Sequence, residues 1–394
     1  MKNMEHVTDT ILYIGCEDRD LDLFESQYEV PNGMAYNSYL VEGESALAVM
    51  DTVDKRKGDE WMDNLKEALQ GRTPDYLVVQ HLEPDHSAMI DAFLQTWPTA
   101  KIVASKRALQ MLPNFADTDV SERSIAVGEG DTLDLGGRTL HFITAPMVHW
   151  PEVIMTYDDK DKAFFSADAF GKFGTRDADE EWDCEARRYY FNIVGKYGPQ
   201  VQAVLKKAGK LDIAIICPLH GPILNENLGK YLNLYNIWSS YKPETEGVFV
   251  AVASIHGNSN KVAEAVRELL LAKGCPKVEY MDLTREKVSE AVENAFRYPK
   301  MILVASSYDA GVFPPMERFL MNASHKGLKN RVVGLVENGS WGPTAARTMK
   351  TLLEGCKDMQ IVEPAVTIHT RLKESDMPAL ENLVDAVLAA DLNA

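Results

Sequence analysis

One short segment constrains this chain more than any other: an apolar run that ends in four potential metal ligands. Residues 78–80 lead directly into His81, Glu83, Asp85 and His86. Pro84 disfavours a helix interior, so we expect an extended segment with His81, Glu83 and Asp85 on one side and a turn after Asp85 that brings His86 round. The alternative is a solvated polar loop, but four ligating groups at the end of one strand favour a metal site.

Three further ligand-type residues follow apolar runs later in the chain. His149 comes after the run that ends at Val148, Asp168 after the run 164–167, and His220 after the run 215–219. Taken singly, each histidine could be a satisfied residue beside the core, and the aspartate could cap a turn or helix. Their shared position at strand ends predicts that they join the first four.

The length and the pattern of the chain predict two domains. A chain of 394 residues is longer than one hydrophobic core usually organises. The segment 240–247 is polar and carries Pro243 and Gly247, which is typical of a linker. We therefore expect one domain over residues 1–244 and a second over residues 245–394.

The two predicted domains differ in their hydrophobic pattern. Before the linker, short apolar runs predict a strand-rich domain with interspersed helices, and these runs are 46–50, 76–79, 101–104, 140–144, 153–157, 163–166 and 213–217. After it, strand-like runs at 248–253, 277–282, 300–305, 331–336 and 361–367 alternate with helix-length amphipathic segments. This alternation predicts a doubly wound parallel sheet.

Three loops of the second domain favour a phosphate-bearing cofactor. The first follows the strand 248–253 and precedes a helix, and it contains Ser254, His256, Gly257, Asn258 and Ser259. Its hydroxyls, its amide side chain and the backbone N–H groups of a helix N-terminus can donate to a phosphate without any cation. An ordinary helix cap is the alternative for this loop alone.

The other two loops follow later strands of the same sheet, where doubly wound folds bind their ligands. One contains Ser306, Ser307, Tyr308, Asp309, Ala310 and Gly311, and the other contains Asn338, Gly339, Ser340 and Trp341. Each offers an aromatic plane, although both aromatics could simply pack at the edge of the core. No G-x-G-x-x-G follows the first strand, so a dinucleotide is not expected.

Taken together, these motifs resemble the flavodiiron proteins over essentially the whole chain. The resemblance implies an N-terminal metallo-β-lactamase-like αββα sandwich and a C-terminal flavodoxin-like domain that binds FMN. It also implies that His81, Glu83 and His149 hold one iron, that Asp85, His86 and His220 hold the other, and that Asp168 bridges them. Hydrolytic relatives of this fold carry a second histidine where this chain has Glu83.

The carboxylate at position 83 is chemically consistent with iron. It makes the site harder and more anionic than an imidazole would, which suits iron in its oxidised states better than zinc. The resemblance implies reduction of dioxygen to water or of nitric oxide to nitrous oxide. Two irons and one FMN together store the four electrons that full reduction of dioxygen requires.

The resemblance also implies an assembly and further site residues. It implies a head-to-tail homodimer or a dimer of dimers, in which Trp341 reaches towards the partner's irons or simply packs on the flavin. It places a tyrosine of the pair Tyr189 and Tyr190 near the substrate, and we select Tyr190 as the candidate. Glu25 stands where some members carry a histidine near the irons.

Charge and cysteine content restrict the partners. The net charge of −18 argues against nucleic acid, no apolar run is long enough to span a membrane, and the first ten residues lack the apolar region of a signal peptide, so we expect a cytoplasmic protein. The five cysteines form no C-x-x-C, and residues 1–394 contain no rubredoxin-like module with four cysteine ligands. We therefore expect rubredoxin or another soluble carrier as the electron donor. The alternatives are a zinc-dependent hydrolase with a flavodoxin-like accessory domain and a non-catalytic electron carrier.

Overall fold

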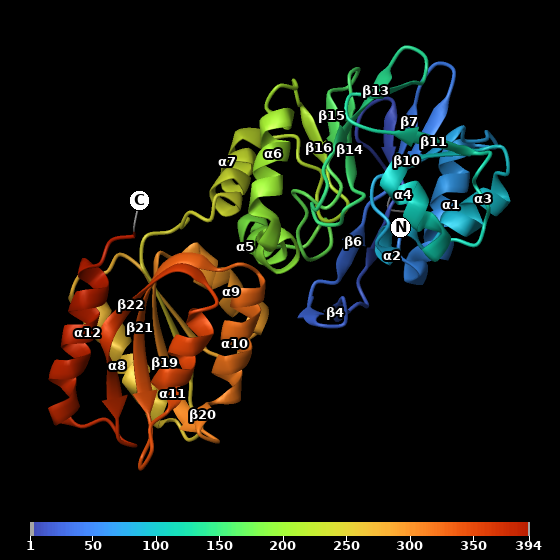
Figure 1. Cartoon of the computed structure of the whole chain (residues 1–394). Helices are drawn as coiled ribbons and strands as arrows, with labels where there is room; N and C mark the ends of the chain where they lie inside the picture. The colour runs from blue at the N-terminus through green and yellow to red at the C-terminus, as the bar shows by residue number, and fades with distance from the viewer. Residues whose placement is uncertain (1–3, 393–394) are drawn as a thin grey trace. The chain divides into compact units, whose positions relative to one another are not determined.

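A computed structural model describes residues 4–392 and divides the chain into two compact units (Figure 1). The first unit extends to Tyr190 and includes Tyr197–Asn236, and the second comprises Phe191–Lys196 and the chain from Ile237 onward. The domain boundary between residues 244 and 245 stays a prediction, since α7 (Leu228–Ser239) runs across the point where the two units meet along the chain.

Two sheets form the centre of the first unit. The larger sheet consists, in spatial order, of β1 (Glu5–His6), β2 (Ile11–Tyr13), β7 (Tyr39–Glu42), β8 (Leu47–Met50), β9 (Tyr76–Val79), β10 (Lys101–Ser105) and β11 (Ser124–Val127). The smaller consists of β12 (Thr132–Asp134), β13 (Thr139–Thr144), β14 (Ile154–Asp158), β15 (Ala163–Phe165) and β16 (Ile215–Cys217). Two short pairs lie outside these sheets, β3 (Cys16–Asp18) with β6 (Met34–Tyr36) and β4 (Leu23–Phe24) with β5 (Tyr28–Glu29).

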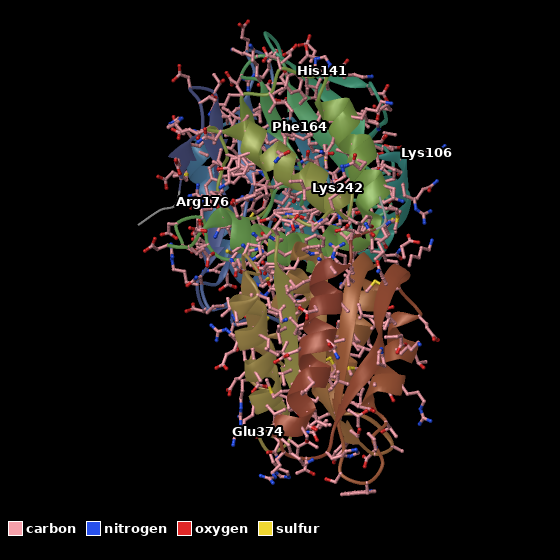
Figure 2. The ribbon with its side chains drawn as sticks, turned by 90° about the vertical axis from the view of Figure 1, so that its left-hand side faces the viewer. Lys106, His141, Phe164, Arg176, Lys242 and Glu374 are labelled. Carbon is pink, nitrogen blue, oxygen red and sulfur yellow. The ribbon has the colours of Figure 1, made fainter. Side chains whose placement is uncertain are left out.

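The core of this unit lies between the two sheets. Alternate residues of β8, Ala48 and Met50, face Phe142 of β13 and Phe165 of β15 in one buried cluster, as expected for a sheet with one face on the core. Figure 2 shows Phe164 inside the unit, whereas His141 and Lys106 lie at its surface. All seven apolar runs predicted as strands in this part of the chain contain strands.

Helices cover the outer faces of both sheets, which gives four layers (Figure 1). On the side of the larger sheet lie α1 (Gly58–Leu69), α3 (Ile90–Thr96) and α4 (Lys106–Met111), and on the side of the smaller sheet lie α6 (Gly198–Ala208) and α7. The remaining helices of the unit are α2 (Pro84–Ser87) and α5 (Trp182–Tyr189). Single turns of tighter or wider helix occur in both units, at η1 (Lys55–Lys57), η2 (Leu112–Asn114), η3 (Tyr190–Val194), η4 (Gly195–Tyr197) and η5 (Glu374–Asp376).

The second unit is a doubly wound parallel sheet, as the sequence predicts. Its strands are, in spatial order, β18 (Val278–Asp282), β17 (Val248–Ala253), β19 (Lys300–Tyr308), β21 (Lys329–Asn338) and β22 (Lys357–Ile368), and β20 (Gly311–Val312) pairs with β19. All main pairings are parallel, and Val250 aligns with Tyr280 and Ile302. This order is the flavodoxin-like one.

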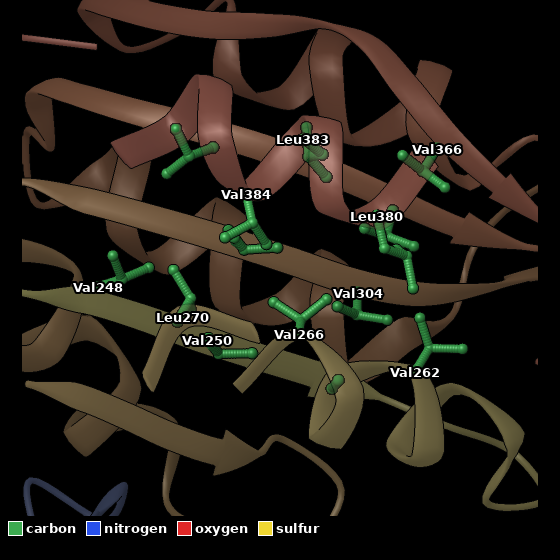
Figure 3. Close-up of a cluster of buried hydrophobic side chains, with 14 of the residues drawn as sticks. Val248, Val250, Val262, Val266, Leu270, Val304, Val366, Leu380, Leu383 and Val384 are labelled. Carbon is green, nitrogen blue, oxygen red and sulfur yellow. The ribbon is translucent and has the colours of Figure 1, made fainter. Parts of the chain in front are cut away.

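Helices pack on both faces of this sheet. They are α8 (Asn258–Ala272), α9 (Val288–Arg297), α10 (Pro314–His325), α11 (Ala345–Leu353) and α12 (Met377–Ala389). The pair α8 and α12 covers one face, where Val266, Leu270 and Val384 bury against Val250 and Val304 (Figure 3). Among the helices described, none is both long enough and apolar enough to cross a membrane.

Candidate metal centre and ligand cavity

The first unit brings all seven predicted metal ligands together in two groups. One group is His81, Glu83, His149 and Asp168, and the other is Asp85, His86 and His220. Within each group, one ligating atom per residue lies within 4.8 Å of the others. The side chains come from the ends of β9, β15 and β16, from α2 and from the loop before β14, so the fold brings together the segments predicted to carry ligands.

The local structure at Pro84 differs from the expected extended segment. Pro84 is the first residue of α2, a position where a missing N–H and a fixed φ favour a helix. The prediction that Asp85 projects beside His81 and Glu83 is therefore wrong, because the helical turn begins before Asp85 and directs it to the group of His86 and His220.

Asp168 lies between the two groups, and each of its carboxylate oxygens faces a different one. Oδ2 is 3.1 Å from Nε2 of His149 and 3.4 Å from Nε2 of His81. Oδ1 is 3.3 Å from Nε2 of His86 and 3.7 Å from Nε2 of His220. This is the placement that a carboxylate needs to bridge two cations.

Hydrogen bonds outside the two groups orient the imidazoles. Nδ1 of His81 donates to Glu152 at 2.8 Å, and Nδ1 of His220 donates to the backbone oxygen of Ala35 at 2.8 Å. Since each Nδ1 donates its proton away from the centre, each Nε2 is directed to the centre and presents a lone pair there once it is deprotonated. Nε2 of His220 lies only 3.1 Å from Nε2 of His86, where two facing lone pairs require a cation or a proton between them.

Whether these residues fit a metal can be judged from the charged groups buried at the centre. Both carboxylate oxygens of Asp85 and of Asp168 are buried without a hydrogen-bond partner. Such groups cost several kcal/mol unless a cation compensates them. The imidazoles and carboxylates are held from outside and face one another inside, a donor set that fits a pair of iron-type cations.

The pKa values of the ligands reflect the same close packing. Burial disfavours the charged form of His149, but Asp168 and Glu83 raise the pKa of His149 to about 9. Burial disfavours the charged form of Glu83 as well, but His149 and His81 lower the pKa of Glu83 to about 2. The imidazoles thus hold protons where cations would otherwise balance the carboxylates, and metal uptake must release those protons.

Asp51, which was not predicted from the sequence, holds the segment before His81 in place through hydrogen bonds. It follows β8, and its carboxylate accepts hydrogen bonds from the backbone N–H of Gln80 at 2.7 Å and from Nε2 of Gln80 at 2.9 Å. Burial raises the pKa of Asp51 to about 6. Its position after an apolar run was the available signal, whereas no sequence pattern marks Glu152.

A cavity of about 470 Å³ leads to the centre. Glu83 and Asp85, one from each ligand group, lie in its wall together with Phe24 and Glu25 of the β4–β5 hairpin. Phe24 packs against His220 with ring centroids 5.4 Å apart. Glu25 therefore lies beside the access route rather than on a remote surface.

The two candidate tyrosines occupy different places. Tyr189 packs against His220 with ring centroids 5.5 Å apart, and burial together with the carboxylates of Asp168, Asp85 and Glu83 raises its pKa. Tyr190 packs against Tyr235 at 5.1 Å. The geometry thus favours Tyr189 over Tyr190, the residue selected from the sequence.

The second unit contains a cavity of about 550 Å³ at the carboxyl ends of its strands. Twelve of the predicted cofactor residues line it: Ser254, His256, Asn258, Ser306, Ser307, Tyr308, Asp309, Ala310, Asn338, Gly339, Ser340 and Trp341. Gly257, Ser259 and Gly311 belong to the same loops but are not in the wall, whereas Ile255, Gly342, Thr344 and Thr370 are. The three loops thus meet around one cavity.

The first loop is already organised by its own hydrogen bonds. Oγ of Ser254 accepts from the backbone N–H groups of Gly257 at 3.0 Å and of Ser259 at 3.2 Å, which leaves its hydroxyl hydrogen to donate. Ser259 is buried, and its hydroxyl lies 2.9 Å from that of Ser306. Of the two hydroxyls expected to bind phosphate, only that of Ser254 therefore lies in the cavity wall.

The cavity combines groups that can bind a phosphate with exposed aromatic rings. Its lining contains no Lys or Arg among the described residues, and α8 begins beside it at Asn258, after Gly257 with φ of 83°. Helix N–H groups and hydroxyls can thus hold an anion there. Tyr308 is 45% exposed and Trp341 is 97% exposed, so both rings are available to a planar ligand.

Known proteins are similar to this chain in both sequence and fold. The sequence profile described as ODP family beta lactamase matches residues 34–221. Diflavin flavoprotein A 1 of Synechocystis sp. is 33% identical over 297 residues, 73% of this chain and 51% of that protein. This chain thus spans about half the length of that relative.

Two further matches cover nearly the whole chain. The nitric oxide reductase of Moorella thermoacetica is 26% identical over 374 residues, 92% of each protein. The solved structure of the rubredoxin oxygen:oxidoreductase of Desulfovibrio gigas superposes with a TM-score of 0.90 at 24% identity, covering 98% of this chain and all of that one. The expected metallo-β-lactamase-like and flavodoxin-like folds are confirmed, and this chain is similar in sequence to the diflavin flavoproteins and in fold to the flavodiiron proteins.

Proposed function

We propose that this protein is an oxidoreductase that reduces dioxygen to water, nitric oxide to nitrous oxide, or both. In this proposal, residues 1–244 hold two non-haem irons, and residues 245–394 hold FMN. The names of the relatives in Moorella and Desulfovibrio support both substrates.

The observation that carries the proposal is the position of Asp168. One of its oxygens faces His81 and His149 and the other faces His86 and His220, at 3.1–3.7 Å. Glu83 and Asp85 add one carboxylate to each group. Three carboxylates against two divalent cations leave the site near neutral with one hydroxide, and such hard ligands favour iron over zinc.

The chain's own residues position and shield the reaction. When bound, iron would supply sites for a diatomic ligand and FMN would supply electrons. Glu152 and the Ala35 carbonyl fix the imidazoles of His81 and His220, so that little reorganisation is needed. Phe24 and Tyr189 surround His220 with aromatic surface, which restricts water beside the centre.

The same proposal covers cofactor and partners. Ser254, Asn258 and the start of α8 would hold the FMN phosphate, with Tyr308 and Trp341 against the isoalloxazine. We propose rubredoxin or another soluble carrier as donor, and a head-to-tail homodimer or a dimer of dimers as the assembly. The 97% exposure of Trp341 supports an approach by a partner at this face.

The decisive experiment measures metal and flavin in purified protein and then follows reoxidation. After anaerobic reduction, a single exposure to dioxygen, and separately to nitric oxide, should reoxidise a protein that contains about two irons and one FMN per chain. Zinc without flavin would support the hydrolase alternative instead. Bound flavin without metal and without reoxidation would support a simple electron carrier.

A further inference from the structure

A fourth segment, which follows β22, contributes to the cavity of the second unit. Thr370 lines this cavity together with the three predicted loops. In the sheet, Asn338 at the end of β21 aligns with Ile368 at the end of β22, so the two chain segments leave the sheet side by side.

Hydrogen bonds join these two segments closely. Nδ2 of Asn338 donates to the backbone oxygen of Thr370 at 2.9 Å, and the backbone N–H of Thr370 donates to Oδ1 of Asn338 at 3.0 Å. The Ser340 and Thr370 hydroxyls also bond to each other. Nδ1 of His369 donates to the Gly339 oxygen at 3.0 Å.

Thr370 is held in a conformation that its side chain disfavours. Its φ is 67°, in the left-handed region that β-branched residues rarely adopt. Such a conformation persists only where surrounding contacts enforce it, and it often marks a functional site. The Asn338 amide, which bonds both backbone polar groups of Thr370, supplies that enforcement.

The segment that carries Trp341 is anchored at its other end as well. The backbone N–H of Thr344 donates to Oγ of Ser307 at 2.8 Å, and its hydroxyl donates to the Gly311 oxygen at 2.8 Å. Residues 339–342 are thus held at both ends, by Asn338 on one side and by Thr344 on the other. Trp341 projects from the middle of this span.

We propose that Asn338 is a positioning residue that holds Thr370 and, through it, fixes residues 339–342 against bound FMN. The inference rests on the proposed flavin site. Asn338 is 8% exposed, and both polar atoms of its amide already bond to Thr370, so in this proposal it acts through Thr370 although it also lies in the cavity wall. Thr370 thus forms part of the wall of the flavin site, although it lies outside the three loops predicted from the sequence.

A mutant cycle tests this role, with FMN titrated into flavin-depleted full-length protein. Asn338→Ala should weaken FMN binding about tenfold, the loss expected when one or two buried hydrogen bonds are removed. Glycine adopts φ of 67° without strain, so in the Thr370→Gly background the same substitution should weaken binding less than about threefold. Asn382→Ala, an exposed asparagine on α12, serves as the matched control.

Hydrogen exchange of residues 368–373 provides a readout independent of flavin. Exchange there should rise in Asn338→Ala without FMN and stay unchanged in the control, while circular dichroism verifies folding. An equal tenfold loss in both backgrounds would make Asn338 a direct flavin ligand and overturn the proposal, as would no loss in either. Failure of the wild-type protein to bind FMN would instead overturn the proposed function, and this inference with it.

Discussion

Nδ1 of His81 lies 2.8 Å from a carboxylate oxygen of Glu152, and neither side chain is exposed. The same oxygen accepts the backbone N–H of Leu82 at 3.0 Å. Glu152 therefore fixes both the tautomer of His81 and the path of the segment that carries Glu83. A residue outside the ligand set thus determines where a ligand nitrogen points.

Replacing Glu152 should weaken metal binding although Glu152 is not itself a ligand. We expect Glu152→Ala to lower affinity about 10- to 100-fold, the usual effect of losing a carboxylate that orients a metal-bound histidine. Glu152→Gln keeps an acceptor and should lose less. Titration with Fe²⁺ or Co²⁺ under anaerobic conditions measures the effect. Glu129→Gln, which alters an exposed partner of Lys207, should match wild type.

The two cofactor sites should be separable by mutation. Asp168→Ala removes the carboxylate that faces both ligand groups, so most iron should be lost while FMN is kept. Ser254→Ala combined with Asn258→Ala removes polar groups from the other cavity and should do the reverse. Metal analysis and flavin absorbance of the same samples measure both. A full complement of iron in the Asp168 variant would contradict the ligand assignment.

Asp51 should make the stability of metal-free protein depend on pH. Its pKa is about 6 in the fold, raised by burial, against about 3.9 for a free side chain. A raised carboxyl pKa stabilises the fold below the unfolded value, and this contribution is lost as pH rises through the folded value. Relative to Asp51→Asn, wild type should gain about 2 kcal/mol as pH falls from 7 to 4.

Urea unfolding of both proteins at several pH values measures this difference. Because the other titrating groups are common to both, they cancel in the comparison. An equal stability difference at pH 7 and pH 4 would show that Asp51 has an ordinary pKa.

Tyr189 and Tyr190 should differ in their effect on turnover. Tyr189 packs against His220, so Tyr189→Phe should slow single-turnover reoxidation about tenfold if its hydroxyl acts near the bound gas. Tyr190→Phe, with its ring against Tyr235, should stay close to wild type. Both variants should retain their iron. The opposite ranking would restore Tyr190 as the residue beside the substrate.

Most of the architecture and the identity of the candidate ligands follow from local patterns in the sequence. The alternation of apolar runs and amphipathic segments predicts the parallel sheet from β17 to β22, because both faces of such a sheet must be covered. His81, Glu83, His149 and Asp168 could be selected because each follows an apolar run. A strand end is a local property, and local patterns reveal it.

The orientation of these residues and the contacts that support them depend on tertiary packing, which local patterns do not reveal. Pro84 starts a helix rather than ending an extended strand, so Asp85 turns to the group of His220. Glu152 meets His81, and Thr370 meets Asn338, across long stretches of chain with no pattern of their own. The packing of two sheets sets the first contact and the pairing of β21 with β22 sets the second, and both depend on the fold of a whole unit rather than on any local segment.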